Sequence, residues 1–437
     1  MSETLKFTPK YSDIRVEDGE LRFVLSGDDD YGFDKSLVNA LRRILLTDIP
    51  SIAFNITESG ENSDIVMVEN NSSLHNEMLL HRISLIPLYI DPNKYMKNYL
   101  FECKVVHDTN TPFKFITMDD INIYPLKSGF IERLDYYYDD SHDMDHDDEQ
   151  NLLDELSVVN IDNYDLNKPL SQKDKDNIIR PFIFRDTKNY CIITELKTTN
   201  TEDIHQNIHW YGSPSIGYGY QDAKYQSVSQ ATYSFEINET LVNETLNEKL
   251  KIDQVSQEDK EEYSKKFKLA ESERYYFRDK FSEANRYNFR IKSNHYYDSE
   301  TLFIKSIEIL KDKCELLKLE FIKLLKEEKS RISFEKNKEY IYHLEVDNEN
   351  HTLGNLIQTH ISRRCINDES LINIFGYKKP HPLEDKILFI VSLNPKHKVS
   401  QLDEVGRFNN INTYLIERLD EIINDVRILS KVTEKIF

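Results

Sequence analysis

Aspartates at alternate positions near residue 145 are the first residues whose types and spacing could support chemistry. Asp143, Asp145 and Asp147 form a D-x-D-x-D motif, and three carboxylates at this spacing could chelate a hard cation. An EF-hand loop is excluded, because Asp148 stands where that loop needs glycine. No Lys or Arg lies within 135–149 to meet a triphosphate, and the segment carries these acidic residues: Asp135, Asp139, Asp140, Asp143, Asp145, Asp147, Asp148 and Glu149. Such a run repels itself, so a solvated acidic loop is favoured over a catalytic site.

Other residues with metal-ligating chemistry are too few or too scattered to form a site. His142 and His146 could bind a transition metal if their segment were helical, but two ligands do not complete a site. The cysteines lie far apart with no C-x-x-C pair, at Cys103, Cys191, Cys314 and Cys365. A disulfide framework and a zinc ribbon are therefore not expected, and a reducing compartment is the default. Phosphate-binding loops, serine-hydrolase elbows and zinc-protease motifs are also missing, so no familiar enzyme class is visible.

Length and charge narrow the classes of function. The 437 residues correspond to about three folded units at ~150 residues each. Lys and Arg number 56 against 77 Asp and Glu, which leaves a formal net charge of −21. Because phosphate binding depends on clustered basic residues, direct contact with nucleic acid over a broad face is not expected. No apolar run reaches the ~18 residues of a membrane span, and the first residues lack the layout of a signal peptide. We expect a soluble, intracellular protein.

Strand and helix patterns near the N-terminus give the first structural elements. Alternating apolar residues over 21–25 predict a short strand. A helix follows with Asp34 as its N-cap, and Pro50 prevents its continuation. Its apolar stripe consists of Leu37, Leu41, Ile44 and Leu45. A second helix is predicted over 74–85, and Pro87 ends it. The charge-rich stretch 236–280 is interpreted as an exposed, partly helical insertion.

Two long amphipathic helices are predicted in the second half. The first covers 303–324, with apolar residues spaced alternately by four and three: Phe303, Ile307, Leu310, Cys314, Leu317, Phe321 and Leu324. A seam of period 3.5 requires a partner helix. The C-terminal helix offers a matching stripe, in Ile411, Leu415, Leu419, Ile422, Val426 and Leu429. A coiled coil with another protein is the alternative, but pairing within this chain explains both stripes at once.

The layout of the N-terminal part returns after residue 340. A strand is predicted over 340–346, then a helix carrying TLGNLIQTHI at 352–361, and a buried strand over 387–393. The segment SLVNALRRILL at 36–46 shares the pattern [S/T]-L-x-N-x-[L/I] with this second helix, whose apolar residues are Leu353, Ile357 and Ile361. Two related strand-helix units in one chain, each too apolar to stand alone in water, predict an intramolecular dimer about a pseudo-twofold axis.

The motifs resemble those of a known family. SLVNALRRILLTDIPSIAF at 36–54, NSSLHNEMLLHRISLIPL at 71–88 and GYGYQDAKYQSVSQATYSF at 217–235 are similar to the alpha-type assembly subunit of multisubunit RNA polymerases, although Tyr225 and Val228 replace the family's Trp and Pro. In eukaryotes this is the third-largest polymerase II subunit, and in archaea it is the D subunit. The stretch from HTLGNLI at 351 through FGYKKPHPLEDKILFIVSL at 375–393 resembles the smaller partner, the eleventh subunit or archaeal L. The segments 91–215 and 236–285 match poorly.

The resemblance implies an assembly platform. It implies an α+β fold, with an alpha-subunit-type dimerisation domain formed intramolecularly and an inserted, mainly β domain. The expected organisation is a D-like module at 1–49 and 232–326, an inserted domain at 50–231, a linker at 327–339 and an L-like module at 340–437. Implied partners are the largest and second-largest polymerase subunits and the small subunits of the tenth and twelfth type. Docking of the second-largest subunit would fall to Arg42, Arg43, His81 and Arg82. His81 could equally be satisfied within its own helix, and the arginines could be merely solvated.

The resemblance also bears on cofactors, origin and competing functions. The eukaryotic relative has a zinc loop of clustered cysteines, where this chain has only Cys103, so no cofactor is expected. D-plus-L fusions are typical of large nucleocytoplasmic DNA viruses, which implies viral transcription in the host cytoplasm and presence in the virion, with the nucleus as the alternative. The expected function is a non-catalytic subunit of a DNA-directed RNA polymerase. The alternatives are a metal-dependent nucleic-acid enzyme that uses the acidic loop, and a free-standing adaptor with the same dimerisation fold.

Overall fold

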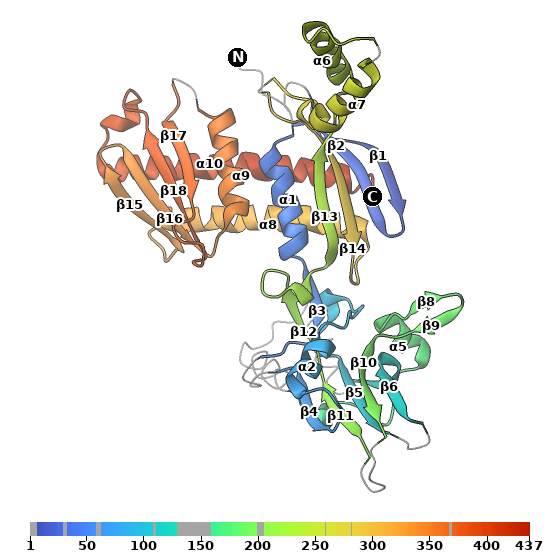
Figure 1. Cartoon of the computed structure of the whole chain (residues 1–437). Coiled ribbons are helices and arrows are strands. Elements are labelled where there is room, and N and C mark those ends of the chain that lie inside the picture. The colour runs from blue at the N-terminus through green and yellow to red at the C-terminus, as the bar shows by residue number, and fades with distance from the viewer. Residues whose placement is uncertain are drawn as a thin grey trace. The chain divides into compact units, whose positions relative to one another are not determined.

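The fold combines helices and antiparallel sheets in two compact units (Figure 1). The computed structural model describes residues 7–28, 33–57, 63–107, 111–128, 159–198, 205–257, 259–280, 282–366 and 369–437. The first unit is drawn from Met1–Ile49, Val228–Ser293 and Asp298–Phe437, and the second from Pro50–Ser227 and Asn294–Tyr297. The D-x-D-x-D motif and the pair His142 and His146 lie outside the described residues.

The first unit contains the same arrangement of elements twice. Its first half runs β1 (Lys10–Glu17), β2 (Glu20–Ser26), α1 (Lys35–Thr47), β13 (Val228–Phe235), β14 (Arg286–Ser293) and α8 (Ser299–Leu325). Its second half runs β15 (Ile332–Lys338), β16 (Ile341–Asp347), α9 (His351–Arg364), β17 (Ile372–Lys378), β18 (Lys386–Leu393) and α10 (Glu404–Thr433). The sheets have equivalent antiparallel orders, β1-β2-β14-β13 and β15-β16-β18-β17. The repeat is therefore a complete ββαββα unit.

Local chemistry sets the boundaries of these elements. Asp18 and Gly19 both have positive φ between β1 and β2, as a tight hairpin turn requires. Each of the four main helices starts at an Asp or Asn whose side chain accepts a backbone N–H of the first turn: Asp34 for α1, Asp298 for α8, Asn350 for α9 and Asp403 for α10. These caps satisfy N–H groups that have no partner within the helix.

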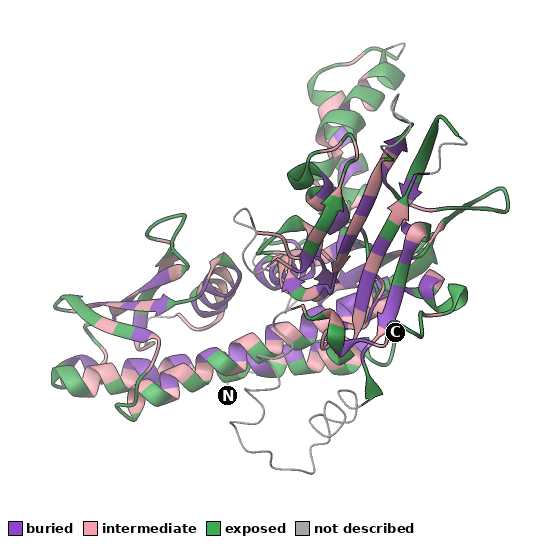
Figure 2. Ribbon diagram, turned by 90° about the horizontal axis from the view of Figure 1, so that it is seen from below, coloured by how far each residue is buried: buried purple, intermediate pink, exposed green. Residues whose placement is uncertain are grey.

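Side chains from both halves share one hydrophobic interior. Phe437, just beyond the end of α10, makes ring contacts with Phe23 of β2 and Phe303 of α8, with centroids 5.7 and 6.3 Å apart. The hydroxyls of Tyr11 and Thr433 lie 2.6 Å apart beside these rings. Figure 2 shows the buried residues on the inward faces of the sheets and long helices, and exposed residues on the opposite faces. The second half therefore completes the core of the first.

The stretch between β13 and β14 forms a small helical excursion. It contains α6 (Glu239–Ile252) and α7 (Lys260–Glu271), which are followed by the 3-10 turn η5 (Ser272–Arg274). Val242, Leu246 and Phe267 form a separate small core between the two helices. The predicted exposed insertion over 236–280 is therefore partly helical in the residues that the structure describes.

The second unit is built mainly of strands. Its main sheet has the order β4-β11-β5-β7, from β4 (Ile65–Asn70), β5 (Tyr99–Val106), β7 (Ile121–Pro125) and β11 (Asn207–Gly212). Two-stranded pairs are formed by β3 (Pro50–Ala53) with β12 (Ser215–Tyr218), β6 (Phe113–Thr117) with β10 (Ile192–Lys197), and β8 (Phe182–Phe184) with β9 (Thr187–Asn189). The α-helices among its described residues are α2 (Asn76–Ser84) and α5 (Gln172–Ile178), and its short 3-10 turns include η2 (Met118–Asp120). Trp210 and Phe101 are fully buried in its core.

Two predicted boundaries fall inside secondary structure. The boundary at 231/232 cuts β13, which begins at Val228 and belongs to the sheet of the first unit. The polar segment 327–339, expected to be a linker, contains β15. As an edge strand, β15 is held by backbone bonds to β16 and is mostly exposed, so it needs no apolar pattern.

Candidate assembly interface

Helices α1 and α9 pack against each other at the centre of the first unit (Figure 1). Their predicted apolar residues are all buried: Leu37, Leu41, Ile44 and Leu45 on α1, and Leu353, Ile357 and Ile361 on α9. Burying one Leu or Ile side chain contributes roughly 1.5–3 kcal/mol relative to its exposure. Neither stripe could face water without a large loss of stability.

Polar contacts show that α1 and α9 run antiparallel. Near the end of α1, Arg43 Nε donates a hydrogen bond to Oγ1 of Thr352, at the start of α9, over 2.9 Å. At the other end, the guanidinium of Arg363, in the last turn of α9, lies 3.8 Å from the carboxylate of Asp34, which caps α1. Burial raises the pKa of Asp34, against the lowering effects of the Ser36 N–H and Arg363. A twofold axis perpendicular to the two helices relates such an antiparallel pair.

The long helices α8 and α10 form a second antiparallel pair. Glu315 of α8 pairs with Arg427 of α10 over 2.7 Å, and Lys318 of α8 pairs with Asp420 of α10 over 2.6 Å. The residue numbers rise along α8 while those of the partners fall along α10, so the helices run in opposite directions. These ion pairs accompany a buried seam where α8 packs on α10. The residues predicted for the two helices are all buried: Phe303, Ile307, Leu310, Leu317 and Phe321 of α8 and Leu415, Leu419 and Ile422 of α10. The exposed ion pairs contribute little, so the buried seam supplies most of the stabilisation.

The sequence patterns missed a polar residue in this seam. Asn412 is fully buried, and its side-chain amide donates a hydrogen bond to the backbone carbonyl of Phe321 over 3.1 Å. One buried polar contact can fix the register of paired helices. Its only sequence signal is an Asn next to the apolar stripe, which does not distinguish it from a solvated residue.

Arg42 and Arg43 are both partly buried on α1. Arg42 Nε donates to the side-chain oxygen of Asn39 over 3.0 Å. Arg43 contacts Thr352 within the chain, so part of its hydrogen-bonding capacity serves the internal interface. His81 and Arg82 are exposed on α2 of the second unit, where Arg82 donates to the backbone carbonyl of Ile192 over 2.8 Å. The structure thus places these four residues in two different units.

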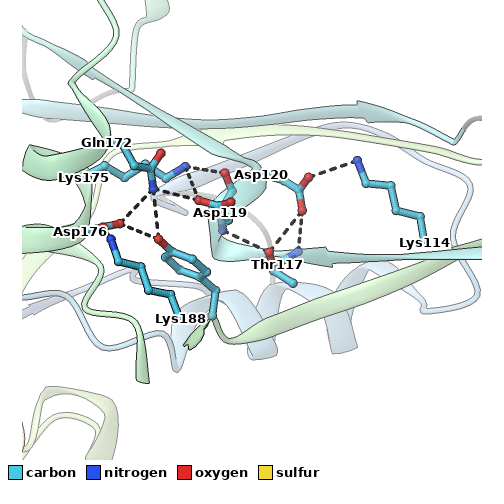
Figure 3. Close-up of polar contacts among 9 residues, drawn as sticks. Lys114, Thr117, Asp119, Asp120, Gln172, Lys175, Asp176 and Lys188 are labelled. Atoms are coloured by element: carbon cyan, nitrogen blue, oxygen red, sulfur yellow. Dashed lines mark hydrogen bonds and ion pairs between the residues drawn. The ribbon is translucent and has the colours of Figure 1, made fainter. Parts of the chain in front are cut away.

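A cluster of polar contacts joins η2 and α5 in the second unit (Figure 3). Asp119, Asp120 and Asp176 each have a lysine partner, at 3.5 Å for Lys175, 3.2 Å for Lys114 and 2.5 Å for Lys188. Gln172 donates to both Asp119 and Asp176 over 3.0 Å. These contacts neutralise the carboxylates and join α5 to η2.

The cysteine expected at the position of the family's zinc loop does not offer a metal ligand either. Cys103 is buried on β5, and burial raises its pKa to about 12, which disfavours the thiolate that a metal requires. All cysteines of the chain are free. None of the helices in the described ranges is long and apolar enough to cross a membrane.

These features define a class of protein: an α+β chain whose two ββαββα halves dimerise with each other and which carries an inserted strand-rich unit. Comparisons with known proteins agree. The family model described as the RNA polymerase Rpb3/Rpb11 dimerisation domain matches residues 30–314, and a second model with the same description matches residues 342–429. The chain belongs to this family and is thus an alpha-type RNA polymerase subunit. The predicted α+β fold is confirmed, and so is the prediction of a non-catalytic subunit, since the family is defined by dimerisation.

Individual relatives resemble only part of the chain. The match to DNA-directed RNA polymerases I and III subunit rpac1 of Dictyostelium discoideum is 31% identical over 96 residues, 22% of each chain. The human RPAC1 subunit is 34% identical over 83 residues, 19% of this chain and 20% of the relative. The Rpo3 subunit of Pyrobaculum aerophilum is 40% identical over 57 residues, 13% of this chain and 19% of the relative. The chain thus spans about a fifth of the length of the curated relatives it matches.

Proposed function

We propose that this protein is the assembly platform of a DNA-directed RNA polymerase and docks the largest and second-largest subunits. The observation that carries the proposal is the antiparallel pairing of α1 with α9 and of α8 with α10, which builds in one chain the interface of the matched dimerisation family. The platform itself carries no catalytic cofactor. Small subunits of the tenth and twelfth type are further proposed partners.

Fusion of a D-like half with an L-like half gives this platform a kinetic advantage. A short tether makes association of the halves intramolecular, with an effective concentration on the order of mM. It also fixes their ratio at one to one. The fusion resembles those of large nucleocytoplasmic DNA viruses, and we infer that the protein serves viral transcription in the host cytoplasm and is packaged in the virion.

We propose that Arg42 and Arg43 on α1 contact the second-largest subunit, and that His81 and Arg82 on α2 contribute a second contact. A partly buried guanidinium retains donors that can pair bidentately with a carboxylate across an interface. Truncation of such a pair typically costs 2 kcal/mol or more, or roughly thirtyfold in affinity.

Co-expression with the largest and second-largest subunits, followed by affinity capture, tests these contacts. Arg42→Ala combined with Arg43→Ala is expected to reduce recovery of the second-largest subunit. Thr352→Val removes only the internal partner of Arg43, and Arg427→Ala removes an arginine from α10, so both controls are expected to retain recovery. Equal loss in the Thr352→Val control would assign Arg43 to internal packing alone, and normal recovery of the double variant would exclude both arginines from docking.

The two alternative functions predict different outcomes in the same system. A metal-dependent enzyme would lose transcription when Asp145 and Asp147 are changed to Asn while the complex still assembles. A free-standing adaptor would purify without either large subunit. For the assembly platform, recovery of both large subunits and unchanged transcription in the Asp145→Asn, Asp147→Asn variant are expected.

A further inference from the structure

Three metal-ligating side chains converge where the end of α9 meets the middle of α10. They are His360 on α9, Cys365 just after its last turn, and Glu421 on α10. Nε2 of His360 lies 3.0 Å from Oε2 of Glu421, and Sγ of Cys365 lies 3.9 Å from the same oxygen. All three ligand atoms lie within 4.8 Å of one another. In the described part of the chain, no other group of three His, Cys, Asp or Glu meets this criterion.

These distances are close to those of a tetrahedral metal centre. Zinc binds thiolate sulfur at about 2.3 Å and imidazole nitrogen or carboxylate oxygen at about 2.0–2.2 Å, so neighbouring ligands lie roughly 3.3–3.8 Å apart. The Cys365–Glu421 separation already falls near this range, and the remaining adjustment is about 1 Å or less. A nitrogen, a sulfur and an oxygen together suit a borderline cation such as Zn²⁺.

The site combines a buried ligand with an open side. The ring of His360 is buried, whereas Cys365 is partly exposed and the side chain of Glu421 is 46% exposed. An ion could enter beside Glu421, and a water could complete four-fold coordination.

Two arginines lie next to the three ligands, and both would have to adjust their positions if a metal ion were bound. NH1 of Arg418 lies 3.5 Å from Sγ of Cys365 and 2.8 Å from Oε1 of Glu421, while its NH2 already lies 3.3 Å from Glu417. Displaced from the cluster, this guanidinium would keep Glu417 as a partner. Arg364 lies 3.4 Å from Nδ1 of His360 and is paired with Asp425 over 2.9 Å. It would have to shift slightly if Nδ1 carried the proton.

We propose that His360, Cys365 and Glu421 form a zinc-binding site that staples α9 to α10. Nε2, the thiolate and the carboxylate each donate an electron pair to Zn²⁺, and the thiol proton, together with any second proton on the imidazole, leaves for solvent. The charges of the thiolate and the carboxylate balance the ion. The site is independent of the proposed docking function and stabilises the L-like half.

Cobalt substitution in the full chain tests the site. After chelation, Co²⁺ is titrated into the wild-type protein and its absorption is recorded. We expect a thiolate-to-cobalt charge-transfer band that saturates near one Co²⁺ per chain and disappears when Zn²⁺ is added. Binding by carboxylates or histidines elsewhere gives no such band.

Three variants make the test specific. Cys365→Ser is expected to abolish the band, whereas Cys191→Ser, which removes the exposed cysteine outside the cluster, is expected to retain it. Glu421→Gln is expected to weaken Co²⁺ binding at least about tenfold. Circular dichroism and hydrogen exchange without metal verify that each variant is folded. Absence of the band in the wild type, its persistence in Cys365→Ser, or unchanged affinity in Glu421→Gln would overturn the three-ligand site.

Discussion

Replacing Leu317 by Ala tests the internal pairing of the long helices most directly. Leu317 is fully buried on α8, and the next residue toward the N-terminus, Leu316, is 59% exposed. A buried Leu→Ala change costs about 2–5 kcal/mol, through lost transfer free energy and the cavity left behind. A surface change away from special features stays within about 0.5 kcal/mol. The two neighbouring leucines therefore form a matched pair with the same chemistry and different burial.

Hydrogen exchange with mass spectrometry is the suitable assay, because a chain with two compact units need not unfold in one step. A loss of 2 kcal/mol raises the population of open states about thirtyfold, since each 1.4 kcal/mol is a factor of ten. We expect amide exchange in α8 and α10 to accelerate at least about thirtyfold in Leu317→Ala and less than about threefold in Leu316→Ala. Equal effects of the two changes, or acceleration confined to α8, would refute the argument that the helices stabilise each other.

Two further predictions concern Gly354 on α9 of the L-like half and Glu320 on α8 of the D-like half. A Cβ added at Gly354 on α9 would lie 2.6 Å from the Tyr377 ring. Gly354→Ala is therefore expected to lower the free energy of unfolding by about 1–3 kcal/mol, measured as faster amide hydrogen exchange in α9. Unchanged amide exchange would mean that the Tyr377 ring moves aside without loss of stability. The Lys323 ammonium and the Arg331 N–H lower the pKa of Glu320 to about 2. The ionised carboxylate therefore stabilises the fold fully above its ordinary pKa near 4.5, and this contribution to the free energy of unfolding is lost as the pH falls through about 2. An acid titration followed by circular dichroism is expected to show a weaker stability change between pH 4.5 and 2 in Glu320→Gln than in the wild type, and identical profiles would contradict the assignment.

Sequence patterns anticipated the long amphipathic helices, and they missed several strands, including the central strand β14 with its alternating Tyr287, Phe289 and Ile291. The stripes of α1, α8, α9 and α10 lie at helical spacing, and burial of one face against another apolar surface is what selects such spacing. The edge strands β1 and β15 escaped prediction because their side chains are mostly exposed. Backbone hydrogen bonds to one neighbouring strand hold such edge strands in place, and these bonds do not depend on which side chains the strand carries.

Some residues of the candidate sites could be predicted from the sequence and others could not. Apolar interface residues such as Leu37 and Leu353 could be read from the sequence, because burial selects their type. The contacts of Asn412 with Phe321, and of His360 with Cys365 and Glu421, could not. They join residues on different helices, and polar residue types are equally common on solvated surfaces.

The sequence by itself determined that this chain carries two related amphipathic units that must bury their apolar faces, since the hydrophobic effect depends on the spacing of apolar residues along each helix. Only the tertiary structure decided that each unit is a full ββαββα repeat, that both helix pairs run antiparallel, and which polar groups meet between them. Those outcomes depend on distances between segments far apart in the chain. Packing geometry sets such distances, and no local pattern encodes them.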